Sequence, residues 1–443
     1  MLLALQEKST VCDQCKVDGA SLLIKFLEKR FDMEEKPKIP LKIIALMGSV
    51  IISQIGLSVY ITALNWRVLE FSNSAFYTGV IATSMTLPQF LFSLAGGAIA
   101  DTKEKLRSLR LIIMVQALVA FLFSLVSARP SFNFWATFAI SFLLGTLSAI
   151  WQPIYLSYIP NLIDKAYVPF GMSLSLMGLY ASRFLGPMIA GWLLNHYSPW
   201  TPYVVYFFSL LLPLLVLYLV KLPISVVAPS KSNAKKTFQP SVILQDKAIL
   251  ALWLINVALS LFIMSIFSII PYFAKNIFGL DSTGMSSLMS ACGMGQMIGA
   301  LLSMAIGKRN ELGFGKNQFL GYVLMGVSLL LFTVSSNMIL AIIALLSMNI
   351  LHGVLSPRVN TIIQTYVPEN MRGKVQSMFL LVFGFVPFGQ FLLGLPTTST
   401  APRIGAIIYV SLFLITLLVV FLKKDVLFQL QLENGSVSLK KEE

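Results

Sequence analysis

Apolar segments of about 18–25 residues recur along this 443-residue chain from Ile43 onward. Each is long enough to cross a hydrocarbon core about 30 Å thick as an α-helix. The composition agrees, because 56% of the residues are hydrophobic and only 12% are charged, values that a water-soluble globule of this length does not need. The sequence therefore predicts an all-α polytopic membrane protein.

The spacing of these segments predicts twelve transmembrane helices. The expected spans are 43–65, 76–99, 109–128, 133–153, 168–193, 202–221, 249–274, 284–307, 317–336, 338–357, 373–395 and 404–422.

Basic residues predict the orientation of the spans. Sixteen lysines and arginines lie in the loops that follow even-numbered spans, whereas the opposite loops contain four: Arg67, Arg129, Lys275 and Arg403. By the positive-inside rule, both termini are expected in the cytoplasm. The net charge of +14 is scattered over short loops, so it indicates no nucleic-acid-binding module. The short outer loops favour a bacterial inner membrane.

A proline- and lysine-containing stretch divides the chain into six spans plus six. It contains Pro223, Pro229, Pro240 and the run Lys231-Ser-Asn-Ala-Lys-Lys, which is typical of a flexible linker. Before the first span, Ser21–Phe31 could form an amphipathic helix on the inner membrane surface or belong to a disordered leader. The expected parts are a cytoplasmic tail (1–41), a first bundle (42–221), a linker (222–247), a second bundle (248–423) and a cytoplasmic tail (424–443).

An internal repeat supports two related halves. Gly145-Thr-Leu-Ser is echoed by Gly353-Val-Leu-Ser, and Tyr158-Ile-Pro by Tyr366-Val-Pro, with all shared positions 208 residues apart. Two homologous six-helix bundles, with a substrate site between them near the midplane, are the pattern of the major facilitator fold.

The loop between the second and third spans resembles a signature of major facilitators. Leu87-Pro88, Ala95-Gly-Gly-Ala-Ile-Ala-Asp101 and the basic run Lys103 to Arg110 are similar to the family's latch between helices 2 and 3. The usual glycine and paired basic residues after the aspartate are replaced by Thr102 and Glu104. The resemblance implies a gating role for Gly97, Asp101, Lys103, Lys105 and Arg107.

Further segments resemble the enterobactin-exporter-like branch of drug and siderophore efflux proteins. Ser182-Arg-Phe-Leu-Gly-Pro-Met-Ile-Ala-Gly191 is similar to the antiporter motif on helix 5, and Gln364–Lys374 matches a second conformational motif. The resemblance implies conformational roles for Gly186, Pro187, Gly191, Arg372 and Gly373, and it implies export of a siderophore-like or drug-like molecule.

No enzyme chemistry is indicated by the sequence. The chain lacks a His-Glu-x-x-His helix motif, a Gly-x-Ser-x-Gly elbow and a Gly-Lys-Ser/Thr phosphate loop. Cys12 and Cys15 form one Cys-x-x-Cys pair, but a structural zinc site needs four ligands. We therefore expect no cofactor and no metal, and transport driven by an ion or substrate gradient.

Arg183 lies alone within an apolar segment, beside Gly186-Pro187. A cation near a bilayer centre costs about 2.5–3.5 kcal/mol on insertion scales, so it should face a wet cavity, a polar partner or an anionic ligand. The alternative is an arginine that snorkels from a helix end. Uncharged polar residues in other spans are further candidates to line the substrate cavity, although each could instead bond between helices: Gln54, Ser58, Asn256, Ser260, Asn349 and Gln390.

Proton coupling has few candidate carriers. The predicted spans contain no Asp or Glu, so the nearest titratable groups are Glu70, Asp101 and His352. Alternatively, His352 is a packing residue and Asp101 is only a latch.

Three functions remain open at this point. The first is a proton-coupled exporter of a small amphipathic or anionic molecule, working as a monomer in the lipid bilayer. An importer of a small metabolite on the same fold is the second, and a non-transporting sensor or scaffold is the third.

Overall fold

The protein is described here from a computed structural model. The described residues are 41–100, 105–129, 132–159, 162, 168–219, 246–306, 314–394, 402–422, 430–433 and 436–439. Residues 1–40 of the predicted tail 1–41, almost all of the predicted linker and most of the predicted C-terminal tail lie outside them.

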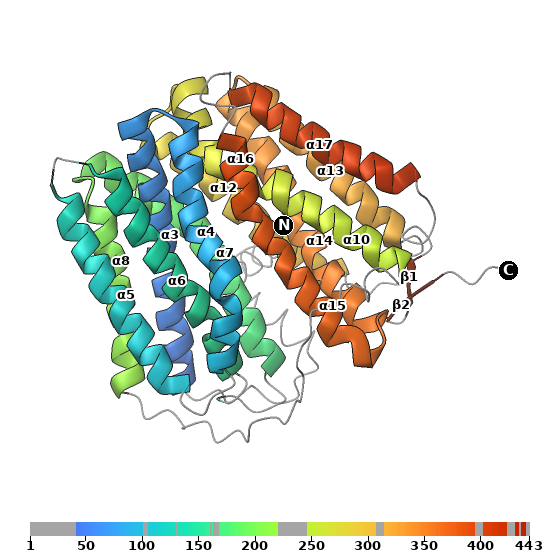
Figure 1. The fold of residues 1–443 in the computed structure, drawn as a ribbon, viewed down its shortest axis with the longest axis horizontal. Coiled ribbons are helices and arrows are strands. Elements are labelled where there is room, and N and C mark those ends of the chain that lie inside the picture. The colour runs from blue at the N-terminus through green and yellow to red at the C-terminus, as the bar shows by residue number, and fades with distance from the viewer. Residues whose placement is uncertain are drawn as a thin grey trace, which may run out of the picture. The chain divides into compact units, whose positions relative to one another are not determined.

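Long helices form nearly all of the described structure, and in residues 45–422 they pack side by side (Figure 1). They are α3 (Leu41–Ser72), α4 (Ala75–Ala100), α5 (Lys105–Ser127), α6 (Phe134–Tyr158), α7 (Val168–His196), α8 (Thr201–Leu219), α10 (Lys247–Ala258), α11 (Ile270–Tyr272), α12 (Ser282–Ile306), α13 (Phe314–Val334), α14 (Met338–Thr365), α15 (Glu369–Leu381), α16 (Val386–Gly394) and α17 (Pro402–Leu422).

These helices occupy all twelve predicted span positions. Within the described residues, nine helical stretches are long and apolar enough to cross a membrane. The other three positions are filled by α4, α7 and the continuous run α15–α16, in which Val382–Phe385 is a 3₁₀ turn. The all-α class is confirmed, although several helices are longer than predicted: α3 continues to Ser72 and α14 to Thr365.

The faces of α5 show how the sequence places a helix in the bundle. Leu111, Leu118 and Leu125, spaced seven residues apart, are 53–56% exposed, whereas Ile113 and Ala120 are buried. Apolar side chains on both faces are favourable only where the outer face meets lipid.

The seventh predicted span is a broken helix. Residues 247–277 pass from α10 through a π-helical turn (Leu259–Ile263), a 3₁₀ segment (Met264–Ile269) and α11 to a second π turn (Phe273–Ile277). Ser265 Oγ donates to the carbonyl of Leu261 at 2.8 Å, and Pro271 has no N–H to continue the ladder. This span therefore has built-in points of bending.

Small residues bring the first six spans against the last six at one end of the helices, where α3 leads into α4 and α7 into α8. Near the end of α7, a Cβ on Gly191 would lie 2.6 Å from the Cβ of Ser286 on α12. Near the start of α4, a Cβ on Gly79 would lie 2.7 Å from the Gln390 carbonyl oxygen on α16. Backbones approach this closely only where side chains are missing.

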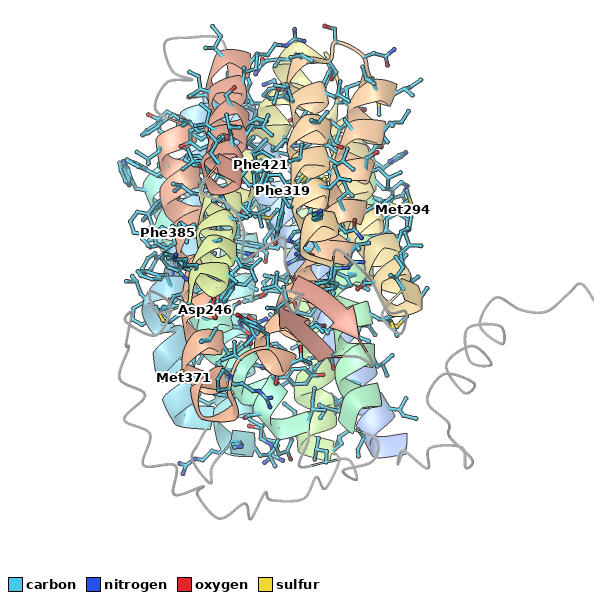
Figure 2. The ribbon with its side chains drawn as sticks, turned by 90° about the vertical axis from the view of Figure 1, so that its right-hand side faces the viewer. Asp246, Met294, Phe319, Met371, Phe385 and Phe421 are labelled. Atoms are coloured by element: carbon cyan, nitrogen blue, oxygen red, sulfur yellow. The ribbon has the colours of Figure 1, made fainter. Side chains whose placement is uncertain are left out.

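A short antiparallel hairpin is the main addition to the predicted fold. Strands β1 (Leu430–Glu433) and β2 (Ser436–Leu439) pair within the region expected to be a simple C-terminal tail. β1 contacts α13 and β2 contacts α14, and Figure 2 shows the hairpin beside the helices. The C-terminal segment is therefore tied to the bundle.

Candidate functional site

Arg183 is held on α7 by a polar network that reaches two other helices. Its Nη1 donates to Gln296 Oε1 on α12 at 2.7 Å. The Gln296 amide nitrogen in turn lies 3.3 Å from Asn349 Oδ1 and 3.5 Å from His352 Nδ1, both on α14. The structure thus brings together three predicted site residues, Arg183, Asn349 and His352, around one glutamine.

Backbone packing explains why Arg183 and Gln296 meet. Gly293 lies one turn before Gln296 on α12, and a Cβ there would overlap the backbone of Arg183 and Phe184. Without that Cβ, α12 lies against the helix backbone at Arg183. Gln296 is 4% exposed and Asn349 is fully buried, whereas Arg183 keeps accessible surface.

Among the residues that the structure describes, no carboxylate forms a salt bridge with Arg183. Within the described residues, the salt bridge is Arg67–Glu70, at 3.6 Å on the last turns of α3. A guanidinium has five N–H donors, and one short contact to an amide oxygen leaves it able to bind an anion bidentately. The site therefore places the positive charge of Arg183 beside the side chains of Gln296, Asn349 and His352.

Gln296 is a functional candidate that the sequence reasoning missed. Its segment reads Gly293-Met-Gly-Gln-Met-Ile-Gly-Ala300, in which Gln296 is the one polar side chain. The available signal was a lone amide on a glycine-rich face of an apolar helix.

Several predicted site residues pack between helices near Arg183. A Cβ on Gly186 would lie 2.4 Å from the Cβ of Ser58 on α3, so α3 and α7 touch directly here because residue 186 is a glycine. Pro187 is buried within α7, and Gln54 is half-buried on α3.

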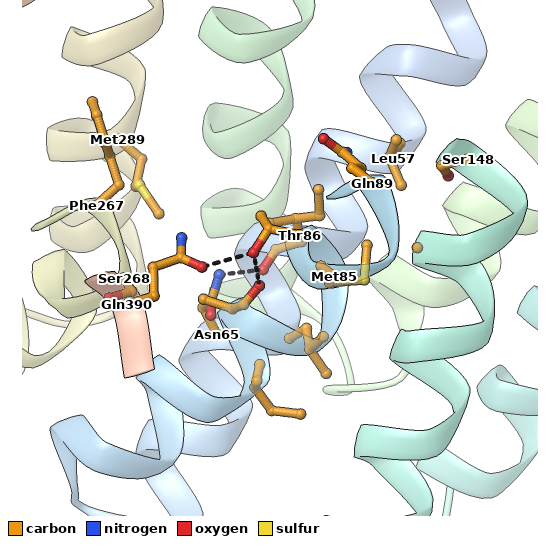
Figure 3. A pocket seen from close by; sticks show the side chains of 15 residues that line it. Leu57, Asn65, Met85, Thr86, Gln89, Ser148, Phe267, Ser268, Met289 and Gln390 are labelled. Carbon is orange, nitrogen blue, oxygen red and sulfur yellow. Dashed lines mark hydrogen bonds between the residues drawn. The ribbon is translucent and has the colours of Figure 1, made fainter. Parts of the chain in front are cut away.

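Gln390 lies at a different place, on the wall of a cavity of about 180 Å³ (Figure 3). Its Oε1 accepts a hydrogen bond of 2.9 Å from Thr86 Oγ1 on α4. Fifteen residues from α3, α4, α6, η5 (Met264–Ile269), α12 and α16 line this cavity, and Arg183 is not among them. Thr86 and Asn65 were not predicted as site residues.

Asn256 and Ser260 line neither this cavity nor a larger one among α7, α12, α13 and α14. The Asn256 amide nitrogen donates to the Leu252 carbonyl at 2.8 Å and lies 3.4 Å from Tyr322 Oη on α13. Ser260 is 1% exposed, and its carbonyl accepts from Ser265 at 3.2 Å. The Asn256–Tyr322 contact joins α10 to α13, and the other two contacts lie within the continuous stretch 247–277.

A second cavity, of about 320 Å³, lies among α7, α12, α13 and α14. Its wall is mostly apolar and includes Met177, Met297 and Met304. Its polar members are Tyr180, Ser303, Arg358 and Thr361.

The predicted gating residues are only partly described. Asp101 and Lys103 lie outside the described residues, and Gly97 lies in α4. Lys105 and Arg107 begin α5, and Gly373 lies in α15. Arg372 Nε donates to the Val367 carbonyl at 3.0 Å, which ties the start of α15 to the α14–α15 turn.

Comparisons with known proteins agree with this architecture. The Staphyloferrin A transporter of Staphylococcus aureus (strain NCTC 8325 / PS 47) is 27% identical over 402 residues, covering 87% of this chain and 96% of the relative. The crystal structure of the nucleoside transporter NupG has a TM-score of 0.67 at 14% identity, covering 86% of this chain and 98% of that one. A bacterial homologue of the lysosomal transporter Spinster, in an inward-facing and unoccupied conformation, has a TM-score of 0.66 at 12% identity, covering 88% and 97%. The model of the Major Facilitator Superfamily matches residues 46–389, and the chain therefore belongs to this superfamily of membrane transporters.

Proposed function

We propose that this protein is a secondary active transporter that exports a small anionic molecule, of the siderophore or carboxylate-bearing drug class, across the bacterial inner membrane. The observation that carries the proposal is Arg183, a cation within the bundle whose short contact is to the neutral Gln296 amide oxygen at 2.7 Å. An anionic group would complete its hydrogen bonding and neutralise its charge.

The 27% identity with a protein named for staphyloferrin A supports a siderophore substrate. The resemblance of Ser182–Gly191 to the antiporter motif supports export over import.

The packing of the helices supports an inward-facing state. If the loops after odd-numbered spans are outside, as the positive-inside rule predicts, the close contacts at Gly191–Ser286 and Gly79–Gln390 seal the outer side. A substrate would then enter from the cytoplasm, and rocking of the two sets of helices would open the outer side.

Protons are the proposed counter-ion. His352 lies 3.5 Å from the Gln296 nitrogen, within the Arg183 network, so a charge on its ring would act directly on a bound anion. Glu70 is paired with Arg67 near the outer end of α3, and Asp101 is the third candidate carrier.

Profiling of released compounds tests the function. Medium and cell extracts are compared for strains that lack the gene, express the wild type, or express Arg183→Gln. Wild-type cells should release an anionic compound that the deletion strain retains, and Arg183→Gln should reduce its release at least about tenfold because the anion loses its counter-charge.

A matched control is Arg403→Gln, which removes an arginine that donates to the Ser335 carbonyl at 2.7 Å on another part of the bundle. Release at the wild-type rate by Arg183→Gln, or release of a cationic compound, would contradict the proposal.

A further inference from the structure

Two buried hydroxyls on α12 have no hydrogen-bond partner. Ser286 is 1% exposed and Ser290 is 4% exposed, and the Oγ of each is unpartnered. They are the two hydroxyl oxygens among the buried, unpartnered side-chain atoms in the described part of the chain. A buried polar group without a partner has lost its hydration and gained nothing in return, so these two serines make the packed state less stable.

Serines elsewhere in the bundle avoid this cost by bonding to their own helix. On α4, the buried Ser84 donates to the Ile81 carbonyl at 2.7 Å. On α12 itself, Ser287 donates to the Thr283 carbonyl at 2.9 Å. The two unpaired hydroxyls are therefore a feature of one face of α12, and they are not a general property of serine in these helices.

Ser286 faces a glycine on α7. A Cβ on Gly191 would lie 2.6 Å from the Ser286 Cβ, and the Ser286 Oγ is the atom nearest to that position. Because Gly191 has no side chain, it offers the hydroxyl neither a donor nor an acceptor group beyond its helical backbone.

Ser290 lies one turn further along the same face of α12. Beyond it, a Cβ on Gly293 would overlap the backbone of Arg183 on α7. The pairing of α7 with α12 runs antiparallel between these two contacts, which puts Ser290 at the level of Pro187, a buried residue. Proline has neither a polar side chain nor an N–H group. At both levels α7 therefore has no side chain that could pair with the hydroxyl.

We propose that Ser286 and Ser290 act as a hydration-dependent bias on the contact between α7 and α12. While the two helices are packed together, both hydroxyls are dry and unpaired. When the helices separate, water reaches the hydroxyls and restores their hydrogen bonds, so the two serines favour the open state. The inference rests on alternating access, which the proposed export function requires.

The rate at which a buried thiol is modified measures this bias. Ser282→Cys is the reporter, because Ser282 is 5% exposed and its carbonyl oxygen would lie 3.1 Å from a Cβ on Gly191. Cys12, Cys15 and Cys292 are replaced by alanine, and the protein is held in nanodiscs, where a maleimide reaches both sides. While the open state is the minor one, the rate of modification follows its population.

The expected result is that Ser286→Ala/Ser290→Ala lowers the rate at least about tenfold, because an alanine methyl group loses no hydrogen bond when the contact closes. Ser290→Ala alone should give a smaller decrease. Ser287→Ala is the matched control, and it should leave the rate unchanged because the Ser287 hydroxyl is paired within α12. Size-exclusion chromatography of fluorescent fusions verifies that each variant is folded, and Ser290→Ala decides the test if the double variant is not.

An unchanged or faster rate in the folded alanine variants overturns the bias and leaves the export function standing. The bias is also overturned if the reporter thiol is never modified in a protein that releases its compound, because α7 and α12 would then not separate at this end. Failure of wild-type cells to release any compound beyond the deletion strain is a different outcome. It rejects the export function, while the modification rates still decide the bias.

Discussion

At the scale of single residues, the candidate site depends on how one arginine is kept charged and accessible inside a membrane bundle. Arg183 is anchored by a neutral amide oxygen, and Asn349 in turn positions that amide from α14. A neutral anchor holds the guanidinium in place without cancelling its charge, whereas a carboxylate at the same position would cancel it.

Replacement of Gln296 by glutamate tests this difference. Gln296→Glu should form an ion pair with Arg183, so the folded protein should be retained while transport of the anionic compound falls at least about tenfold. Thermal unfolding and release rates measured on the same preparations check both parts. Gln296→Leu is the control, because it removes the acceptor of Arg183 Nη1 and the donor to the buried Asn349 Oδ1, and it should lower stability by about 1–3 kcal/mol. Undiminished transport by Gln296→Glu would contradict the neutral-anchor account.

At the scale of elements, glycines decide which helices touch. The contact between α7 and α12 depends on Gly293 and Gly191, because a Cβ at either position would meet the opposite helix. On α3, by contrast, a Cβ on Gly48 would meet nothing within 4 Å.

Gly293→Ala should therefore destabilise the packed state by about 1–3 kcal/mol, as expected for overpacking. Gly48→Ala is the matched substitution, and it should be neutral or slightly stabilising because alanine favours the helix. Thermal unfolding in one detergent compares the two variants. Equal changes in stability for Gly293→Ala and Gly48→Ala would show that the close approach of α7 and α12 does not depend on the absence of a Cβ at residue 293.

The connection between α10 and α14 provides a pH-dependent element. Tyr366 Oη, just after α14, donates at 2.9 Å to Asp246 Oδ2, and Asp246 also caps α10 through the N–H groups of Ala248 and Ile249. Burial, together with the Asp246 carboxylate, raises the pKa of Tyr366 to about 12.

Because the unfolded tyrosine ionises near pH 10 and the folded one does not, the contribution of Tyr366 to stability is complete below pH 10 and is lost as the pH rises toward 12. Tyr366→Phe should accordingly show a shallower loss of stability than the wild type over this range. Unfolding curves at about pH 9 to 11 measure the difference. If the free energy of unfolding fell equally with pH in the wild type and in Tyr366→Phe, the raised pKa of Tyr366 would not contribute to stability.

The sequence predicted the positions of the spans because hydrophobic length alone defines them. It did not predict the turns at Leu259–Ile263 and Met264–Ile269, which depend on packing against α16, where a Cβ on Gly389 would overlap the Leu261 carbonyl. Arg183, Asn349 and His352 were predicted as separate candidates, but their grouping around Gln296 required the helix pairing. Asn65 was missed because one amide among apolar residues gives no sign of which cavity it lines.

At the scale of the whole molecule, the proposed transport by alternating access requires the contacts between α7 and α12 to open and close. Gly191 and Ser286 lie at the end where these helices are packed together, so a cross-link there should hold that end shut. If the protein exports by alternating access, a molecule locked in this state cannot release its substrate outside.

The most direct measurement is export by the double variant Gly191→Cys/Ser286→Cys, with Cys12, Cys15 and Cys292 replaced by serine. We expect oxidation to stop release of the wild-type compound and a reductant to restore it. Ser286→Cys alone should stay active under both conditions, and Gly191→Cys alone, whose Cβ would meet Ser286, should give the same rate with and without the oxidant. Export at an unchanged rate by the fully cross-linked protein would contradict the account.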